Sequence, residues 1–298
     1  MLNRTVDVLS AASQHAVAVV NVNVGTCKIG INQSQLDCKE TFSSRTLPNL
    51  RRIIDLMIGI GELHLLNLCD LGCHRQGLQS ANMQIDDLID EALSPGNLDG
   101  FSQGEYAAIY DIGPADEAKV ALHKQWTEEF TLKHSVALDA VLVLTCYRVT
   151  TGALQPAAGL LFCGQLHIRT PTRQRRPGIA TRKLLVKEAM GIITYYAPTN
   201  RADGKISVAV LCGDVNLTQD DADACCQIDI GGPNVATGWR TASSIEGLPG
   251  DVMFVRGSVS VSCDFAIGAG YFDRGIGNAD NDAFFVTIVV PLYGRKLL

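Results

Sequence analysis

Short runs of apolar, largely β-branched residues recur along the whole chain and alternate with segments of helical periodicity. Apolar runs of about four to eight residues are typical of strands that are covered on both faces. Strands that alternate with amphipathic helices are typical of α/β proteins. The pattern predicts buried strands at Val17–Val24, Leu63–Cys69, Ala140–Cys146, Gly159–Ile168, Ile206–Cys212, Val252–Val255 and Phe284–Pro291.

Amphipathic segments between these strands predict helices. Thr218 is a suitable N-cap for one of them, because Asp220 and Asp221 would follow in the positively polarised first turn. No internal repeat or linker interrupts the chain, so we expect one α/β domain over residues 1–298. The predicted helices are Asn49–Ile60, Ser80–Leu93, Ala115–Trp126, Ala180–Tyr195 and Thr218–Gln227.

The composition excludes several classes of protein. Hydrophobic residues make up 47% of the 298 residues and charged residues 19%, so the chain can bury a core and is not disordered. A net charge of −6 argues against a surface that is basic throughout, as in many nucleic-acid-binding proteins. No apolar run reaches the ~18 residues that span a bilayer, so we expect no membrane span.

The ten cysteines do not form the pattern of a disulfide framework. Many lie inside apolar runs, and a chain of this length needs no disulfides to be stable. We therefore expect reduced thiols in an intracellular, reducing compartment. Cys69, Cys73 and His74 form a tight Cys/His cluster without a second ligand pair at zinc spacing, so a zinc- or thiol-dependent protein is one further interpretation.

Polar side chains begin or end most of the predicted strands. Each of them alone has a local explanation, because Asp and Asn bond the nearby backbone and commonly terminate strands. Carboxylates, amides and one imidazole gathered at one end of a sheet would suit a hard cation and an anionic ligand. These candidate residues are Asn21, Asn23, Asp70, His167, Asp214, Asn216, Asp251, Asp280 and Asn281.

The order of these elements resembles the endonuclease/exonuclease/phosphatase superfamily, which includes the DNase-I-like nucleases. Asn-Val-Asn is followed by a strand that ends in an acid, a strand with His, Gly-Asp-Val-Asn, Asp-Val-Met-Phe-Val, and Asp-Asn before the last strand. The resemblance extends from about His15 to Leu292, and Gly-Asp-Val-Asn is its most specific element. It implies a four-layered α/β sandwich of two packed mixed sheets flanked by helices, which hydrolyses phosphoesters with Mg²⁺ at one end of the sheets.

The resemblance implies roles for the candidate residues in the first part of the chain. Asn21 and Asn23 would lie at the metal and phosphate site, and His167 would bind or protonate the phosphate. Asp70 would be the main metal ligand, at a position where the family uses Glu. Its shorter carboxylate should loosen the site, because Mg²⁺ requires near-ideal octahedral geometry.

The resemblance also implies roles for the later residues. Asp214 and Asn216 would orient the nucleophilic water and contact the phosphate, and Asp251 would be the carboxylate partner of the catalytic His. Asp280 and Asn281 stand where the family ends in Ser-Asp-His, so the closing His is an Asn here. An amide cannot take a proton near neutral pH, so general-base help worth about 10²–10⁴ in rate would be missing.

These departures lead to two hypotheses of different classes. The first is a catalytically degenerate protein of this fold that acts as a binding or structural subunit of a larger assembly, with Mg²⁺ bound weakly or not at all. The second is an active Mg²⁺-dependent phosphodiesterase or nuclease that tolerates both changes. We favour the first hypothesis, because catalysis requires a group of suitable pKa in place.

A basic stretch without any acidic residue follows His167. Arginine forks match phosphate geometry, so this basic strip over residues 169–187 would track the phosphates of a nucleic acid, or bind an acidic protein surface. The alternative is a solvated loop and helix face. No aromatic residue interleaves, so base stacking is not indicated. The strip comprises Arg169, Arg173, Arg175, Arg176, Arg182, Lys183 and Lys187.

Overall fold

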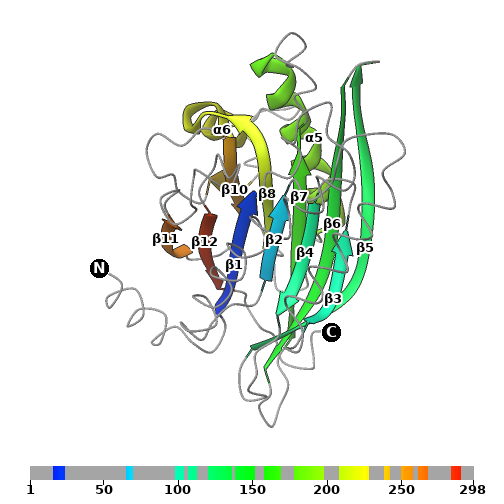
Figure 1. Cartoon of the computed structure of the whole chain (residues 1–298), viewed down its shortest axis with the longest axis vertical. Helices are drawn as coiled ribbons and strands as arrows, with labels where there is room; N and C mark the ends of the chain where they lie inside the picture. The colour runs from blue at the N-terminus through cyan, green and yellow to red at the C-terminus, as the bar shows by residue number, and fades with distance from the viewer. Residues whose placement is uncertain are drawn as a thin grey trace, which may run out of the picture.

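The computed structural model contains two β-sheets and helices that cover one of them (Figure 1). Within the described residues, each sheet has six strands, and the helices are α5 (Ile179–Tyr196) and α6 (Gln219–Cys226). The predicted mixed α/β class is therefore confirmed. The structure describes residues 16–23, 65–69, 98–103, 107–112, 120–135, 138–151, 158–168, 178–197, 208–227, 238–241, 250–257, 261–267 and 283–289.

The first sheet, sheet A, has the strand order β11-β12-β1-β2-β4-β3. Strands β1 and β2 are parallel, and the other neighbours are antiparallel. Asn21 of β1 stands opposite Asn67 of β2 on one side and Phe284 of β12 on the other. The strands are β1 (Ala16–Asn23), β2 (Leu65–Cys69), β3 (Leu98–Gln103), β4 (Ala107–Ile112), β11 (Val261–Ile267) and β12 (Ala283–Val289).

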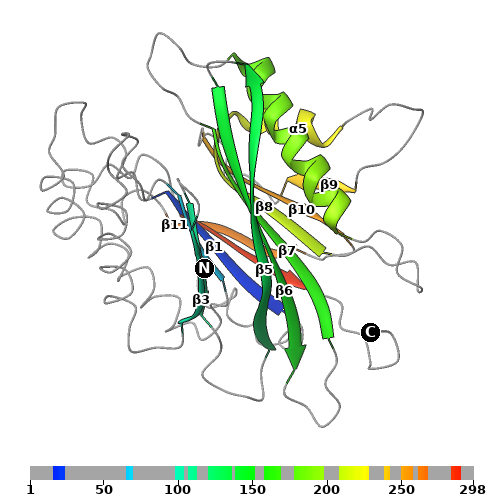
Figure 2. The same cartoon turned by 90° about the vertical axis from the view of Figure 1, so that its right-hand side faces the viewer.

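The second sheet, sheet B, has the strand order β5-β6-β7-β8-β10-β9. Its strands β7 and β8 are parallel, and α5 lies between them in the sequence as the crossover that parallel strands require. Strands β5 and β6 form a long twisted hairpin at one edge (Figure 2). The strands are β5 (Val120–Ser135), β6 (Leu138–Thr151), β7 (Ala158–His167), β8 (Val208–Leu217), β9 (Trp239–Thr241) and β10 (Gly250–Arg256).

A layer of apolar side chains fills the space between the two sheets. Val17 and Val19 of β1 and Leu65 of β2 contribute from sheet A, and all three are fully buried. Residues on the facing side of sheet B complete this core. They are Leu122, Tyr147, Val149, Leu161, Cys163, Val208, Val210, Cys212, Met253 and Val255.

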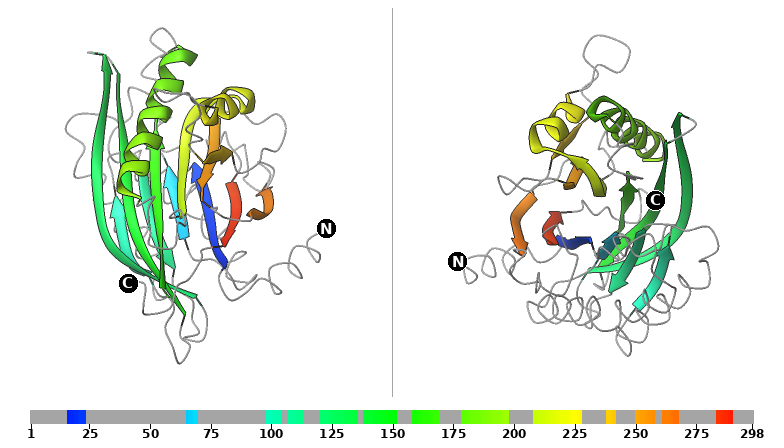
Figure 3. Two further views of the ribbon diagram at one scale, coloured as in Figure 1. Left: turned by 180° about the vertical axis from the view of Figure 1, so that it is seen from behind. Right: turned by 45° about the horizontal axis from the view of Figure 1, so that its top comes forward.

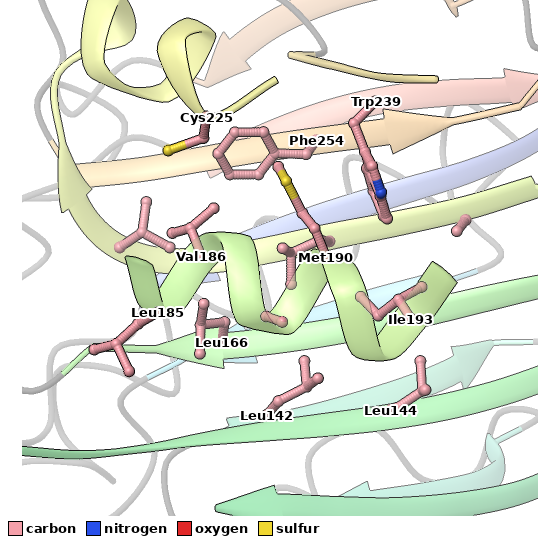
Figure 4. Close-up of a cluster of buried hydrophobic side chains, with 14 of the residues drawn as sticks. Leu142, Leu144, Leu166, Leu185, Val186, Met190, Ile193, Cys225, Trp239 and Phe254 are labelled. Atoms are coloured by element: carbon pink, nitrogen blue, oxygen red, sulfur yellow. The ribbon is translucent and has the colours of Figure 1, made fainter. Parts of the chain in front are cut away.

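The opposite face of sheet B packs against the two helices. In the oblique view of Figure 3, α5 and α6 lie on the same side of this sheet. Helix α5 buries one stripe of side chains against β6, β7 and β8, and Trp239 and Phe254 close the cluster beside it (Figure 4). The buried residues of α5 are Leu185, Val186, Ala189, Met190 and Ile193.

The helix predicted over Ala115–Trp126 is wrong, because residues 120–126 belong to β5. A register shift between Lys124 and Trp126 explains the misleading pattern. This bulge places Leu122 in the core between the sheets, whereas Trp126 packs on the helix side of sheet B. The two residues are four apart, as on one face of a helix, yet they lie on opposite faces of a strand.

The other expectations have mixed outcomes. The predicted strands correspond to β1, β2, β6, β7, β8, β10 and β12, and the last two predicted helices correspond to α5 and α6. Strands β3, β4, β9 and β11 were not predicted. The predicted helices Asn49–Ile60 and Ser80–Leu93 lie outside the described residues. Among the residues that the structure describes, no helix has the length and apolar character needed to cross a membrane.

Gly164 of β7 allows α5 to approach the sheet closely. A Cβ at this position would lie 2.6 Å from Cδ1 of Ile193, 3.2 Å from Cδ1 of Leu142 and 3.3 Å from Cδ1 of Leu211. We predict that Gly164→Ala lowers the free energy of unfolding by about 1–3 kcal/mol, because overpacking a dense core forces side chains to shift. Chemical denaturation at constant pH measures this change.

Two variants serve as controls for this prediction. In α5, a Cβ at Gly191 would meet no atom within 4 Å, so Gly191→Ala should raise stability by about 0.5–1 kcal/mol through helix propensity alone. Ile193→Val removes the Cδ1 atom nearest to the new methyl group, so it should cost less in the Gly164→Ala background than in the parent. Additive effects of Gly164→Ala and Ile193→Val would contradict the proposed overlap.

Candidate functional site

One end of sheet B gathers four of the candidate residues. Parallel strands β7 and β8 end there, at His167 and just beyond Asn216, and antiparallel β10 begins there. Asp251 of β10 stands opposite Asp214 of β8 in the strand register. The backbone therefore brings His167, Asp214, Asn216 and Asp251 to the same end of this sheet.

The corresponding end of sheet A carries two further candidates, Asn21 and Asn23. Strand β1 ends at Asn23, which pairs with Cys69, the last residue of parallel β2. Antiparallel β12 begins at the same end, with Phe284 opposite Asn21. The other three candidates, Asp70, Asp280 and Asn281, lie outside the described residues.

Both sheets present these ends in the same direction. Strands β1 and β2 contact β8 across the space between the sheets. The arrows of β1, β2 and β7 point the same way in Figure 1, and β8 rises to α6 at that end. The two sets of described candidates therefore lie at the same end of the packed sheets.

Gly213 permits a close approach of β8 to β7 just before Asp214. Its φ of 137° lies in a region that side chains rarely adopt. A Cβ at this position would lie 2.1 Å from the carbonyl oxygen of Leu166, the residue that precedes His167. Glycine is therefore required here, and it brings the backbones that carry His167 and Asp214 together.

Asn216 lies in an irregular end of β8. Asp214 pairs with Asp251 and Leu217 pairs with Gly250, so Val215 and Asn216 stand outside the regular pairing with β10. Asn216 has a φ of 52°, a left-handed conformation that Asn adopts more readily than most residues. Its carbonyl oxygen accepts a hydrogen bond from Nη1 of Arg182, in the first turns of α5.

Helix α6 starts directly after this irregular segment. The side chain of Thr218 caps the helix by accepting a hydrogen bond from the backbone N–H of Asp221 at 3.3 Å. Nζ of Lys183 on α5 lies 2.6 Å from Oδ1 of Asp221. The ion pair with Lys183, followed by the hydrogen bond that the Thr218 hydroxyl donates to Oδ2 of Asp221 at 2.9 Å, holds the pKa of Asp221 below its usual value.

The structure divides the basic strip into two parts. Arg182, Lys183 and Lys187 belong to α5, where Arg182 contacts Asn216 and Lys183 pairs with Asp221. Part of the strip thus makes intramolecular contacts at the candidate site. The strip's other members lie outside the described residues; they are Arg169, Arg173, Arg175 and Arg176.

Burial affects the acidity of the two cysteines at the end of α6. Burial raises the pKa of Cys225 to about 11 and that of Cys226 to about 12, and both thiols remain protonated at neutral pH. Within the described part of the chain, no three His, Cys, Asp or Glu residues are grouped to hold a metal ion. Cys69 ends β2, and Cys73 and His74 of the zinc interpretation lie outside the described residues.

Sequence reasoning did not assign roles to two residues of this region. Gly213 was visible within Gly-Asp-Val-Asn, and a glycine before a strand-end acid is a signal for close backbone approach. Arg182 was visible only as one cation of the basic strip. Its contact with the Asn216 carbonyl joins residues 34 apart in the sequence and had no local signal.

Comparison with known proteins shows similarity at the level of the fold. No protein-family model and no curated protein matches the sequence. TDP2 from D. rerio, solved with a single-strand DNA product, superposes with a TM-score of 0.53 at 14% identity, over 92% of this chain and 98% of that one. Beta toxin from Staphylococcus aureus superposes with a TM-score of 0.50 at 9% identity, over 92% of this chain and 100% of that one.

The pair between Lys183 and Asp221 predicts a pH-dependent contribution to stability. A carboxyl group whose pKa is lowered on folding stabilises the protein above its unfolded pKa, and this stabilisation is lost as the pH falls through the folded pKa. Asp221→Asn should therefore lower stability by about 0.5–1 kcal/mol at pH 7, with the difference from the parent shrinking below about pH 4. Urea denaturation at several pH values measures this.

Asp220→Asn is the matched control, because Asp220 occupies the same first turn of α6. It removes a carboxylate from the helix N-terminus without breaking the pair with Lys183. The stability difference of this variant should be smaller and should change less with pH. Equal pH profiles for the two variants would show that Lys183 contributes nothing specific.

Proposed function

On the premise that this chain has the DNase-I-like fold, we propose that it is a catalytically degenerate protein that binds a phosphate-containing ligand or serves as a subunit of a larger assembly. TDP2 and beta toxin share this fold. We further propose that residues 1–298 form a single four-layered α/β sandwich. The fourth layer would be built by residues that precede β2 and β3 in the sequence, where two helices are predicted.

The observation that carries the proposal is the presence of Asn at position 281, two residues before β12 begins. Strand β12 pairs with β1 and begins at Ala283, two residues after Asn281. This start of β12 lies at the same end of the sheets as the described candidate residues. In the resembling family the position of Asn281 holds the closing His. An amide has no accessible pKa near neutrality, so Asn281 cannot act as a general base.

The retained residues support a binding role at the same end of the sheets. His167, Asp214, Asn216 and Asp251 keep the residue types and the order of the resembling family, and their backbones lie together. Mg²⁺ prefers oxygen ligands, so the carboxylate and amide oxygens of Asp214, Asn216 and Asp251 are of a type that binds a hard cation. Asp70 would be its main ligand, and the shorter side chain would make the binding weak.

The basic strip indicates the charge of the partner. Its arginines suit a polyanion, either a nucleic acid or an acidic protein surface. Five of the cysteines in the described strands and helices form no disulfide, and four of these five are buried, which supports a reducing compartment.

An active Mg²⁺-dependent phosphodiesterase is the second candidate. The register pair of Asp214 and Asp251 favours it, because both acids of the resembling site remain at adjacent positions of β8 and β10. Under this alternative, a water or another side chain would replace the missing base. Activity of the parent protein decides between the two candidates.

We predict that replacing Asn281 and Asp70 with the residue types of the resembling family produces phosphodiester hydrolysis. Asn281→His supplies a group with a pKa of about 6.5, and Asp70→Glu adds the methylene group that lets the carboxylate reach Mg²⁺. The two changes act on one catalytic unit, so either alone should give little and both together should give measurable hydrolysis. Hydrolysis of bis-p-nitrophenyl phosphate with millimolar Mg²⁺ measures this in the parent, the two single variants and the double variant.

Metal-dependent stability provides a second readout of the same variants. Mg²⁺ should raise the melting temperature of the Asp70→Glu variant more than that of the parent, because a ligand of the native state stabilises it. Robust turnover by the parent would refute the degenerate function. A silent double variant would refute the view that the defect is confined to these two positions.

We also predict that the arginines preceding α5 supply the contacts to a polyanion. Replacing Arg173, Arg175 and Arg176 with Ala should weaken binding of a fluorescent single-stranded oligonucleotide and lower its salt slope by about 2, at about 0.7 per phosphate contact. Fluorescence anisotropy over a range of salt concentrations measures the slope.

A charge-matched triple variant controls for net charge. Lys124, Arg148 and Arg240 are exposed on β5, β6 and β9, and replacing them with Ala removes the same charge. This control should retain the parental salt slope. An unchanged slope in the strip variant would identify the strip as a solvated face.

A further inference from the structure

Asn216 has a backbone conformation that the β-sheet does not impose. Its position falls between two paired residues of β8, Asp214 and Leu217, and it is outside the regular pairing with β10. Its φ of 52° is uncommon for a residue with a side chain, and such conformations persist only where the surroundings hold them. A contact from another element would help to hold this conformation.

Arg182 supplies that contact from a different element. Its Nη1 donates a hydrogen bond to the carbonyl oxygen of Asn216. A guanidinium is charged at all relevant pH values, so this charge-assisted bond is stronger than one between neutral groups. The carbonyl oxygen of Asn216 lies outside the regular β8–β10 pairing, and Arg182 of α5 is its hydrogen-bond donor.

The backbone at Arg182 is held in place by the elements around it. Its own backbone N–H donates to the carbonyl oxygen of Gly178 at 3.1 Å, in the first turn of α5. The neighbouring Lys183 pairs with Asp221 of α6, and the α5 face beyond it packs on sheet B. The start of α5 is thus joined to the β8–α6 connection through Arg182 and Lys183.

We propose that Arg182 is a positioning residue, which sets the backbone conformation of Asn216 and thereby the placement of Asn216 in the phosphate-binding site. This inference rests on the proposed function of Asn216. It gives Arg182 a role that differs from the rest of the basic strip, because its guanidinium is directed at the protein backbone. Arg182 acts through Asn216 and needs no contact with the ligand.

Two variants of Arg182 separate geometry from charge. Arg182→Lys keeps the charge and loses the planar fork, whereas Arg182→Met loses both. The amide resonance of Asn216, recorded on protein labelled with ¹⁵N-asparagine and assigned by its loss in Asn216→Gly, reports the backbone conformation without any ligand. Both Arg182 variants should shift this resonance, and Arg148→Met, on the exposed part of β6, should not.

Binding of the single-stranded oligonucleotide tests the effect on the site. We expect Arg182→Met to weaken binding about tenfold, as when only about a tenth of the free protein keeps the binding-competent conformation of Asn216, and Arg182→Lys to weaken it several-fold. Arg148→Met should bind as the parent does. In the Asn216→Gly background, Arg182→Met should have no further effect, because glycine adopts a positive φ unaided and the amide side chain is gone.

The outcomes distinguish this inference from the proposed function. An unchanged Asn216 resonance in both Arg182 variants would overturn the inference, whatever the protein binds. Parental affinity in Arg182→Lys together with weak binding in Arg182→Met would also overturn it, because charge alone would then matter. If the parent fails to bind the oligonucleotide, the proposed function fails, and the resonance alone decides whether Arg182 sets the conformation of Asn216.

Discussion

The parallel pairing of β7 with β8 is the constraint on which the rest of the structure depends. Both faces of these strands are buried, one between the two sheets and the other beneath α5. Phe162 and Ala209 face the helix, whereas Cys163 and Val210 face sheet A. A slip of one residue would exchange the two faces, so packing on both sides selects a single register. The crossover by α5 and the relative positions of the ends of β7 and β8 follow from that register.

Strand ends, more than side-chain clustering, define the candidate site. The backbone ladder brings His167, Asp214 and Asp251 to one end of sheet B, and the neighbouring sheet brings Asn21 to the same end. Polar contacts from α5 then hold the segment after Asp214, where the regular pairing of β8 with β10 is interrupted. The apolar layers hold the two sheets together, and the few charged contacts between α5, β8 and α6 shape one short segment.

Much of the fold could be predicted because a strand buried on both faces needs a continuous apolar run. Strands β7 and β8 have such runs and were found. Strand β5 lies at the sheet edge, carries polar residues at many positions, and contains a bulge that mimics helical spacing, so it was taken for a helix in its first half. Strands β3 and β4 are short and carry Asp, Ser or Gly, and sheet A decides their pairing.

By itself, the sequence determined which residues are available for chemistry and in what order they follow the strands. The side chain of Asn281 is an amide, so it cannot take a proton near neutral pH whatever the fold places beside it. Only the tertiary structure decided which distant groups meet. The guanidinium of Arg182 contacts the Asn216 carbonyl because α5 packs on sheet B, although the two residues are 34 apart in the sequence. Hydrophobic packing of the two faces of sheet B sets that distance, and such packing depends on the whole fold rather than on any local pattern.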